Sequence, residues 1–169
     1  IAETLNEYVI GQEQAKRLAR LISEEPIHEI IASPLQRAAH TAAALAEVKG
    51  LAFSTHHGLI EQDFGAWDGL TFAEVKQRYS DNFKGYFKDG NNQAPINGEN
   101  LQAVSERVWS FYETLQWEQG KTIALVGHGC ASQALLCRIM GIPTRGSWPF
   151  RLQNGSLTEV QFKYGQPSL

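Results

Sequence analysis

Apolar and polar positions along this chain fall into blocks that predict strands and helices in turn. Residues 27–32 and 51–57 are short runs typical of strands, and residues 157–164 alternate as a last strand would. Residues 122–126 form a continuous apolar run, which predicts a strand buried on both faces of a sheet. An amphipathic helix is predicted by apolar residues at steps of three and four, namely Leu101, Val104, Val108, Phe111 and Leu115.

Helix starts are indicated by residues that cap free backbone amides. Ser33 is a predicted cap, with Pro34 at the first helical position and Gln36 completing a capping box, and this helix is expected to reach about Val48. Residues 12–24 also have helical spacing.

Two more helices and a long connection are predicted further along. A capping box at Thr71 and Glu74 begins one helix, and another runs from about Cys130 to Gly141. Residues 80–98 are rich in Gly, Asn, Asp and Pro, which predicts a long surface excursion.

Strands that alternate with helices predict an α/β fold of three layers, with a mostly parallel central sheet and helices on both faces. No internal repeat or linker divides the sequence, so residues 1–169 are expected to form a single domain. In open α/β sheets, ligands bind beyond the carboxyl ends of the strands. The residues that follow the strands are therefore the first candidates for a functional site.

Composition and charge narrow the class of ligand. The chain has 43% hydrophobic and 20% charged residues and a formal net charge of −3, which argues against a surface for nucleic acid or anionic lipid. Any bound anion must then be held by a few placed cations. No apolar run reaches membrane-spanning length and no signal peptide is recognised, so a cytoplasmic location is expected.

Two basic residues follow predicted strands. Arg37 lies in the first turn of a helix, where a cation opposes the helix dipole unless an anion lies between them. His128 lies between two glycines, at the end of an apolar strand and before a helix whose first amides can bind an anion. Taken alone, Arg37 also fits a solvated surface arginine, and His128 also fits a packed loop residue.

A carboxyl group is the third candidate. Glu61 lies among apolar residues in the loop 59–69. Burial there and a nearby phosphate would both raise its pKa, which suits a general acid. A loop glutamate is also commonly solvent-facing, and Asp63 and Asp68 compete for the role.

In chain order, four segments resemble the histidine phosphatase superfamily, also called phosphoglycerate-mutase-like. They are residues 27–42 (IHEIIASPLQRAAHTA), 59–69 (LIEQDFGAWDG), 95–108 (PINGENLQAVSERV) and 126–129 (VGHG). The resemblance implies catalysis through a covalent phosphohistidine, with two arginines and a second histidine holding the phosphoryl oxygens. It implies no metal and no other cofactor, because cationic side chains supply the charge stabilisation.

The resemblance also implies a role for each candidate. Arg37 corresponds to the second arginine and His128 to the second histidine, while Gly129 lends a backbone amide. Glu61 corresponds to the acid that protonates the leaving group and later activates water as a base.

The sequence departs from the family at the nucleophile. The family's attacking histidine lies in an Arg-His-Gly motif, and no such triplet occurs in the 169 residues. The remaining histidines are better explained as surface or packing positions; they are His28, His40, His56 and His57. We expect that the sequence, which does not begin with Met, lacks the first strand that carries this motif. The alternative is a degenerate phosphatase that binds phosphate esters without turnover.

The expected function is hydrolysis of a small phosphate ester. Residues 64–69 resemble those of α-ribazole phosphatases and broad-specificity metabolite phosphatases more than those of mutases. A phosphomutase and a non-catalytic binder of phosphate esters are the alternatives, and a homodimer is left open. Residues 80–98 are expected to set specificity by covering the site like a lid, through Phe83, Tyr86, Phe87 and Lys88.

Overall fold

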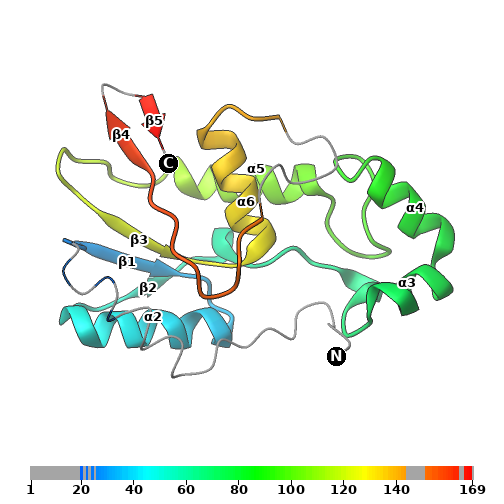
Figure 1. Cartoon of the computed structure of the whole chain (residues 1–169), viewed down its shortest axis with the longest axis horizontal. Helices are drawn as coiled ribbons and strands as arrows, with labels where there is room; N and C mark the ends of the chain where they lie inside the picture. The colour runs from blue at the N-terminus through cyan, green and yellow to red at the C-terminus, as the bar shows by residue number, and fades with distance from the viewer. Residues whose placement is uncertain are drawn as a thin grey trace.

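The core of the protein is a parallel sheet of three strands in the order β2–β1–β3. The strands are β1 (Glu29–Ala32), β2 (Ser54–Thr55) and β3 (Ile123–Val126). β1 pairs with β3 along its whole length, and its last two residues pair with β2. The carboxyl ends of β1 and β3 therefore lie side by side (Figure 1). The computed structural model describes residues 20, 22, 24, 26–143, 151–163 and 166–168.

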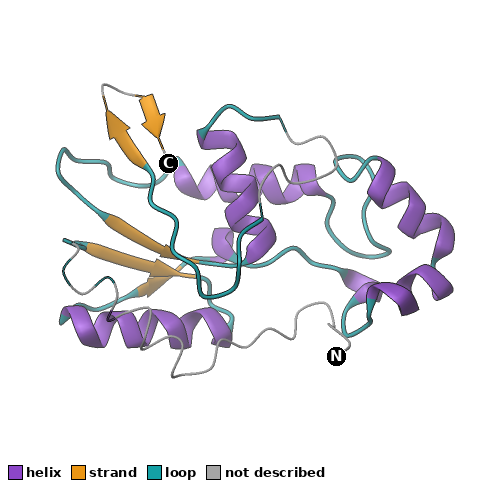
Figure 2. Ribbon diagram, viewed as in Figure 1, coloured by secondary structure: helices purple, strands orange, loops and turns teal. Residues whose placement is uncertain are grey.

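Helices cover both faces of this sheet (Figure 2). On one face, α2 (Gln36–Lys49) packs in a hydrophobic cluster with Ile30 of β1. On the other face, α5 (Leu101–Tyr112) and α6 (Gly129–Ile139) share a second cluster with Ile31. Neighbouring strand residues point to opposite faces, so Ile30 and Ile31 belong to two separate cores. The predicted three-layer α/β fold is confirmed.

Three predicted strands differ in detail. Residues 51–57 contain only β2, because the chain turns at once into a short 3-10 helix, η1 (His57–Leu59), that contacts α5. β3 is half-buried rather than buried on both faces, because it lies at one edge of the described sheet. In residues 157–163, the described part of the last predicted strand, the strand is limited to β4 (Gln161–Lys163), which pairs antiparallel with β5 (Gln166–Ser168) in a separate two-stranded sheet.

The predicted cap of α2 is wrong. The helix begins at Gln36 with Leu35 as its N-cap residue, and no side chain caps it. Ser33 is fully buried instead, and its Oγ accepts a hydrogen bond of 3.3 Å from the Leu35 amide. The hydroxyl of Ser33 is directed into the interior because it has a second partner there, described below.

The predicted capping box of α3 (Phe72–Arg78) is confirmed. The Glu74 amide donates to Thr71 Oγ1 at 3.2 Å, and the Thr71 amide donates to Glu74 Oε2 at 2.8 Å. Both hydrogen bonds satisfy amides that the first helical turn leaves without a partner.

The first half of the predicted surface excursion is a helix, α4 (Ser80–Lys88). Tyr86 of α4 is buried in a third hydrophobic cluster together with Val75 of α3 and Trp67 of a short 3-10 helix, η2 (Gly65–Trp67). The composition did not predict this helix, because Asn, Gly and Asp have low helix propensity. Tertiary packing outweighs that low propensity. α3 and α4 lie beyond the strand ends at one end of the molecule (Figure 1).

The helix predicted at residues 12–24 lies almost entirely outside the described residues. Among the helices that the structure does describe, none has the length and apolar character needed to cross a membrane.

Candidate active site

His128 lies directly after β3, at the N-cap position of α6. The Nε–H of Arg37, in the first turn of α2, donates to His128 Nδ1 at 3.2 Å. The other ring nitrogen, Nε2, lies 2.8 Å from Ser33 Oγ. Because Nδ1 accepts the hydrogen bond from Arg37, the proton of the neutral ring must be on Nε2, which donates to Ser33. His128 thus joins the ends of β1 and β3 through two hydrogen bonds.

His128 is held in its neutral form. Burial is the main cause that lowers the pKa of His128 to about 4, and the positive charges of Arg37 and Arg107 lower it further. The ring is therefore uncharged near neutral pH. A dianion bound beside it would favour its protonation and offset the charge of Arg37.

The same hydrogen bond excludes Ser33 as a nucleophile activated by His128. A general base must present a lone pair to the hydroxyl, but the nitrogen that faces Ser33 carries the ring proton in this arrangement. Ser33 therefore orients the ring and does not attack.

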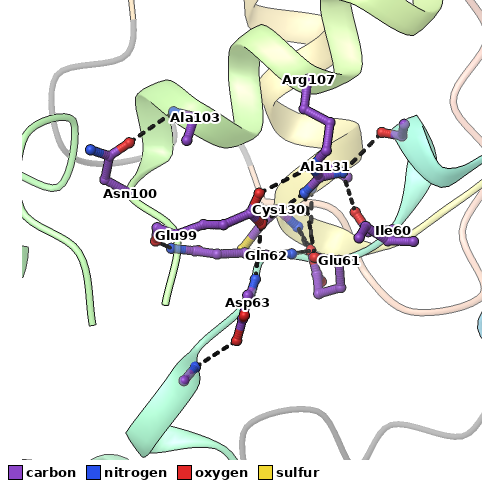
Figure 3. A network of polar contacts seen from close by, with 12 residues as sticks. Ile60, Glu61, Gln62, Asp63, Glu99, Asn100, Ala103, Arg107, Cys130 and Ala131 are labelled. Atoms are coloured by element: carbon purple, nitrogen blue, oxygen red, sulfur yellow. Dashed lines mark hydrogen bonds and ion pairs between the residues drawn. The ribbon is translucent and has the colours of Figure 1, made fainter. Parts of the chain in front are cut away.

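Glu61 reaches the N-terminus of α6 from the loop between β2 and α3. Its Oε1 accepts hydrogen bonds from the amides of Gln62 at 2.9 Å, Cys130 at 3.1 Å and Ala131 at 3.3 Å. Its Oε2 accepts from the Cys130 amide at 3.3 Å. The carboxyl group lies against the first amides of an α-helix (Figure 3), a position that suits an anion.

Burial raises the pKa of Glu61, although the three amides and the charge of Arg37 act in the opposite direction. A buried carboxyl whose proton is retained to higher pH can donate that proton to an oxygen leaving group. The amides favour the ionised carboxylate and burial favours the neutral acid, so Glu61 is placed to give up a proton and to take one back.

The structure brings the three predicted residues together. Arg37 contacts His128 directly and acts electrostatically on Glu61, and Glu61 binds the amide of Cys130 in the turn that His128 begins. The competing carboxylates Asp63 and Asp68 are exposed, and Asp63 Oδ1 accepts from the Gly65 amide within its own loop.

Gly129, the fourth predicted site residue, is the first residue of α6. A Cβ atom at this position would lie 3.7 Å from Glu61 Oε2, an ordinary van der Waals contact. The site therefore has room for a small side chain here, and steric crowding does not by itself require a glycine.

The remaining histidines either bond a backbone amide or are exposed. His28 Nδ1 accepts from the Thr122 amide at 3.0 Å, and His56 Nδ1 accepts from the Gly58 amide at 2.9 Å. His40 and His57 are exposed. In the ranges that the structure describes, no three His, Cys, Asp or Glu side chains are placed to hold a metal ion.

Sequence reasoning missed several polar residues around Glu61. Arg107 of α5 donates to backbone carbonyls of the loop that carries Glu61, and it forms an ion pair of 2.9 Å with Glu99. Gln62 is only 1% exposed. Arg107 was not predicted as a site residue, because an arginine on the polar face of an amphipathic helix is usually a solvated residue.

Comparison with known proteins places the chain in a class of hydrolases that act on phosphate esters. It is 31% identical to Phosphoserine phosphatase 1 of Hydrogenobacter thermophilus over 156 residues, 90% of this chain and 73% of the relative. It is 30% identical to Adenosylcobalamin/alpha-ribazole phosphatase of Escherichia coli over 151 residues, 89% of this chain and 74% of the relative. The crystal structure of the Alpha-ribazole Phosphatase from Shigella flexneri superimposes with a TM-score of 0.84 at 27% identity, covering 99% of this chain and 84% of that chain.

The family model described as Histidine phosphatase superfamily (branch 1) matches residues 5–169. The chain belongs to this superfamily.

Proposed function

We propose that this protein hydrolyses a small phosphorylated metabolite through a phosphohistidine intermediate, with Arg37 and His128 binding the phosphoryl group and Glu61 protonating the leaving alcohol. One observation carries the proposal. Arg37, His128 and the carboxyl of Glu61 meet beyond the ends of β1 and β3, around the N-terminus of α6. This is where an α/β sheet binds an anion.

The roles follow from the chemistry of each group. The guanidinium of Arg37 has four N–H donors besides the one that contacts His128, and its planar fork matches two phosphoryl oxygens. A bound dianion would favour protonation of His128 at Nδ1, which would release the hydrogen bond from Arg37 and add a positive charge beside the phosphoryl group. Gly129 would lend its amide to the same oxygens.

Glu61 supplies the proton that an alkoxide leaving group needs. After the leaving alcohol departs, the ionised Glu61 would accept a proton from the attacking water. The phosphohistidine intermediate requires an attacking histidine, which the family resemblance places in an Arg-His-Gly triplet. No such triplet occurs in the 169 residues, so Arg37, His128 and Glu61 hold the phosphoryl group and move the proton, and none of them is the nucleophile.

The substrate is proposed to be a small phosphate monoester handled in the cytoplasm. Net negative charge and a site with few cations favour a small anion over a polyanion. Specificity is assigned to residues 80–98, whose first half is α4, with Phe83, Phe87 and Lys88 in the role that the sequence predicts. Tyr86 is the exception. Tyr86 is buried and bonded to Gln62, so it cannot act as part of a lid, whereas Phe87 and Lys88 are exposed.

The test is the hydrolysis of a small alkyl phosphate by the full-length protein. Glu61→Gln is expected to lower kcat/KM by about 10²–10⁴-fold, the usual contribution of a general acid. His128→Ala should weaken the binding of inorganic phosphate. His40→Ala, an exposed histidine of α2, is the matched control and should retain the parent rate. Full activity in both site variants would contradict the proposal.

A further inference from the structure

The guanidinium of Arg107 is bonded to the loop that carries Glu61. Its Nη1 donates to the carbonyl oxygens of Gly58 at 3.0 Å and Ile60 at 3.1 Å, and its Nη2 reaches the carbonyl oxygen of Glu61 itself at 3.5 Å (Figure 3). Half-buried carbonyls in a loop without regular pairing need such donors. One side chain from α5 therefore serves three carbonyls at and before the proposed acid.

Glu99 orients Arg107 and binds the loop on the other side of Glu61. Arg107 Nε and Nη2 donate to Glu99 Oε1 at 3.1 Å and to Oε2 at 2.9 Å, a bidentate pair. Glu99 Oε2 also accepts from the Asp63 amide at 3.0 Å, and the Glu99 amide donates to the Asp63 carbonyl at 2.8 Å. The side chains of the pair are 21% and 24% exposed, so solvent screens them less than it screens a surface ion pair.

Gln62, the residue after Glu61, is held by its side chain. Its Nε2 donates to the Glu99 carbonyl at 2.7 Å, and its Oε1 accepts from the Tyr86 hydroxyl at 3.0 Å. The backbone is thus fixed before, at and after Glu61. From this backbone the carboxyl of Glu61 reaches the amides of Cys130 and Ala131.

We infer that Arg107 and Glu99 are positioning residues for the proton transfer by Glu61. They contact the loop backbone and hold the acid at the helix N-terminus. The inference rests on the proposed role of Glu61 as general acid. A general acid must stay within hydrogen-bond reach of the leaving oxygen, and a displacement of about 1 Å costs on the order of 10²-fold in rate. A lysine at position 107 could not replace the guanidinium group of Arg107, because an ammonium group is a point charge without fixed bidentate geometry.

The test compares two substrates in the full-length protein. An alkyl phosphate needs a proton on its leaving oxygen, whereas 2,4-dinitrophenolate leaves without one. Arg107→Met is expected to lower kcat/KM for the alkyl phosphate by about 10²-fold and for 2,4-dinitrophenyl phosphate by less than about 3-fold. A purely structural role would lower both values alike. Equal losses on the two esters, or no loss on either, would overturn the inference.

Glu61→Gln provides the reference for this difference in kcat/KM between the two esters. If Arg107 acts through Glu61, the double variant Arg107→Met/Glu61→Gln should be no slower on the alkyl phosphate than Glu61→Gln alone, because the two losses are then not additive. Additive losses would overturn the inference while leaving the role of Glu61 intact. A Glu61→Gln variant without leaving-group selectivity would instead overturn the proposed function, and the inference with it.

Two further variants distinguish a loss of positioning from a general loss of folding. Glu99→Gln keeps the shape and one acceptor oxygen of the pair and should show the same selectivity, with a smaller loss than Arg107→Met. Arg138→Met is the matched control. Arg138 is an exposed arginine of α6 that lies over the Trp109 ring, 4.8 Å from its centroid, and its removal should affect the two esters equally and weakly.

Discussion

The ionisation of single side chains is set by how deeply the site is buried. His128 and Glu61 lie a short distance apart, and burial shifts the pKa of each toward the uncharged form, downward for His128 and upward for Glu61. The site by itself is therefore less charged than its composition suggests. An incoming phosphoryl group would change this, because it adds the negative charge that stabilises a protonated His128.

The pKa of His128 predicts how stability depends on pH. The folded pKa of about 4 lies below the ordinary value of 6.5, so the unfolded chain binds the proton more tightly. The free energy of unfolding due to this group is fully present above pH 6.5 and is lost as the pH falls toward 4. Its maximum size is about 3 kcal/mol. Urea denaturation between pH 4 and pH 7.5 measures it.

The free energy of unfolding of the wild type is compared with that of His128→Gln at each pH. Ionisation of Glu61 has the opposite sign, because its raised pKa lowers stability as the pH rises, but Glu61 is present in both proteins and cancels in the difference. The stability difference between wild type and His128→Gln should therefore increase with pH across this window. A difference that stays constant would show that His128 is not held neutral by the fold.

Individual helices begin for different physical reasons. Thr71 and Glu74 form a reciprocal cap that depends only on residues three positions apart, and α3 begins there as its local sequence predicts. Ser33 has the same kind of side chain ahead of a helix, but His128 binds its hydroxyl from the other end of the chain. A long-range contact thus replaces a local one.

Removing the cap of α3 should destabilise the protein measurably. Thr71→Ala deletes the hydroxyl that accepts the Glu74 amide and is expected to lower the free energy of unfolding by about 1 kcal/mol. Thr71→Ser retains the hydroxyl and should recover most of this loss. Equilibrium urea denaturation of the three proteins is the measurement, and a Thr71→Ala variant as stable as the parent would contradict it. The activity should change little, because Thr71 and Glu74 bond each other and are not bonded to Glu61.

The three layers of the molecule are held by two separate cores. The core between the sheet and α2 contains small side chains, and Ala42 of α2 is 0% exposed in it. A small residue at this position lets the helix approach the strands closely. The spacing between the layers therefore depends on the volume of a few alanines.

Enlarging one of these alanines tests the layer packing. Ala42→Leu inserts a larger side chain into a closed core and is expected to lower the free energy of unfolding by about 1–3 kcal/mol. Ala43→Leu, at the exposed neighbouring position of the same helix, is the control and should be nearly neutral. The midpoint of thermal unfolding measures the stability of both variants. Equal stabilities of the two variants would show that α2 is not packed against the sheet as described.

Much of the fold can be predicted from the sequence because it depends on residues close together in the chain. Apolar runs identify β1 and β3, helical spacing identifies α5, and the residues after the strands identify Arg37 and His128. α4 could not be predicted in the same way. Its Asn and Gly residues disfavour a helix locally, and tertiary packing stabilises it, above all the burial of Tyr86 against Trp67.

The sequence alone therefore determined the α/β architecture and the strand-end residues Arg37 and His128, because hydrophobic periodicity and strand-end position are local properties. The resemblance of residues 59–69 to a family indicated Glu61. The arrangement that holds Glu61 was decided only in three dimensions. Arg107 meets carbonyls 46 to 49 positions earlier in the chain, and Ser33 meets His128 across 95 positions. Contacts over such separations form only when helices and strands pack, so no local pattern contains them.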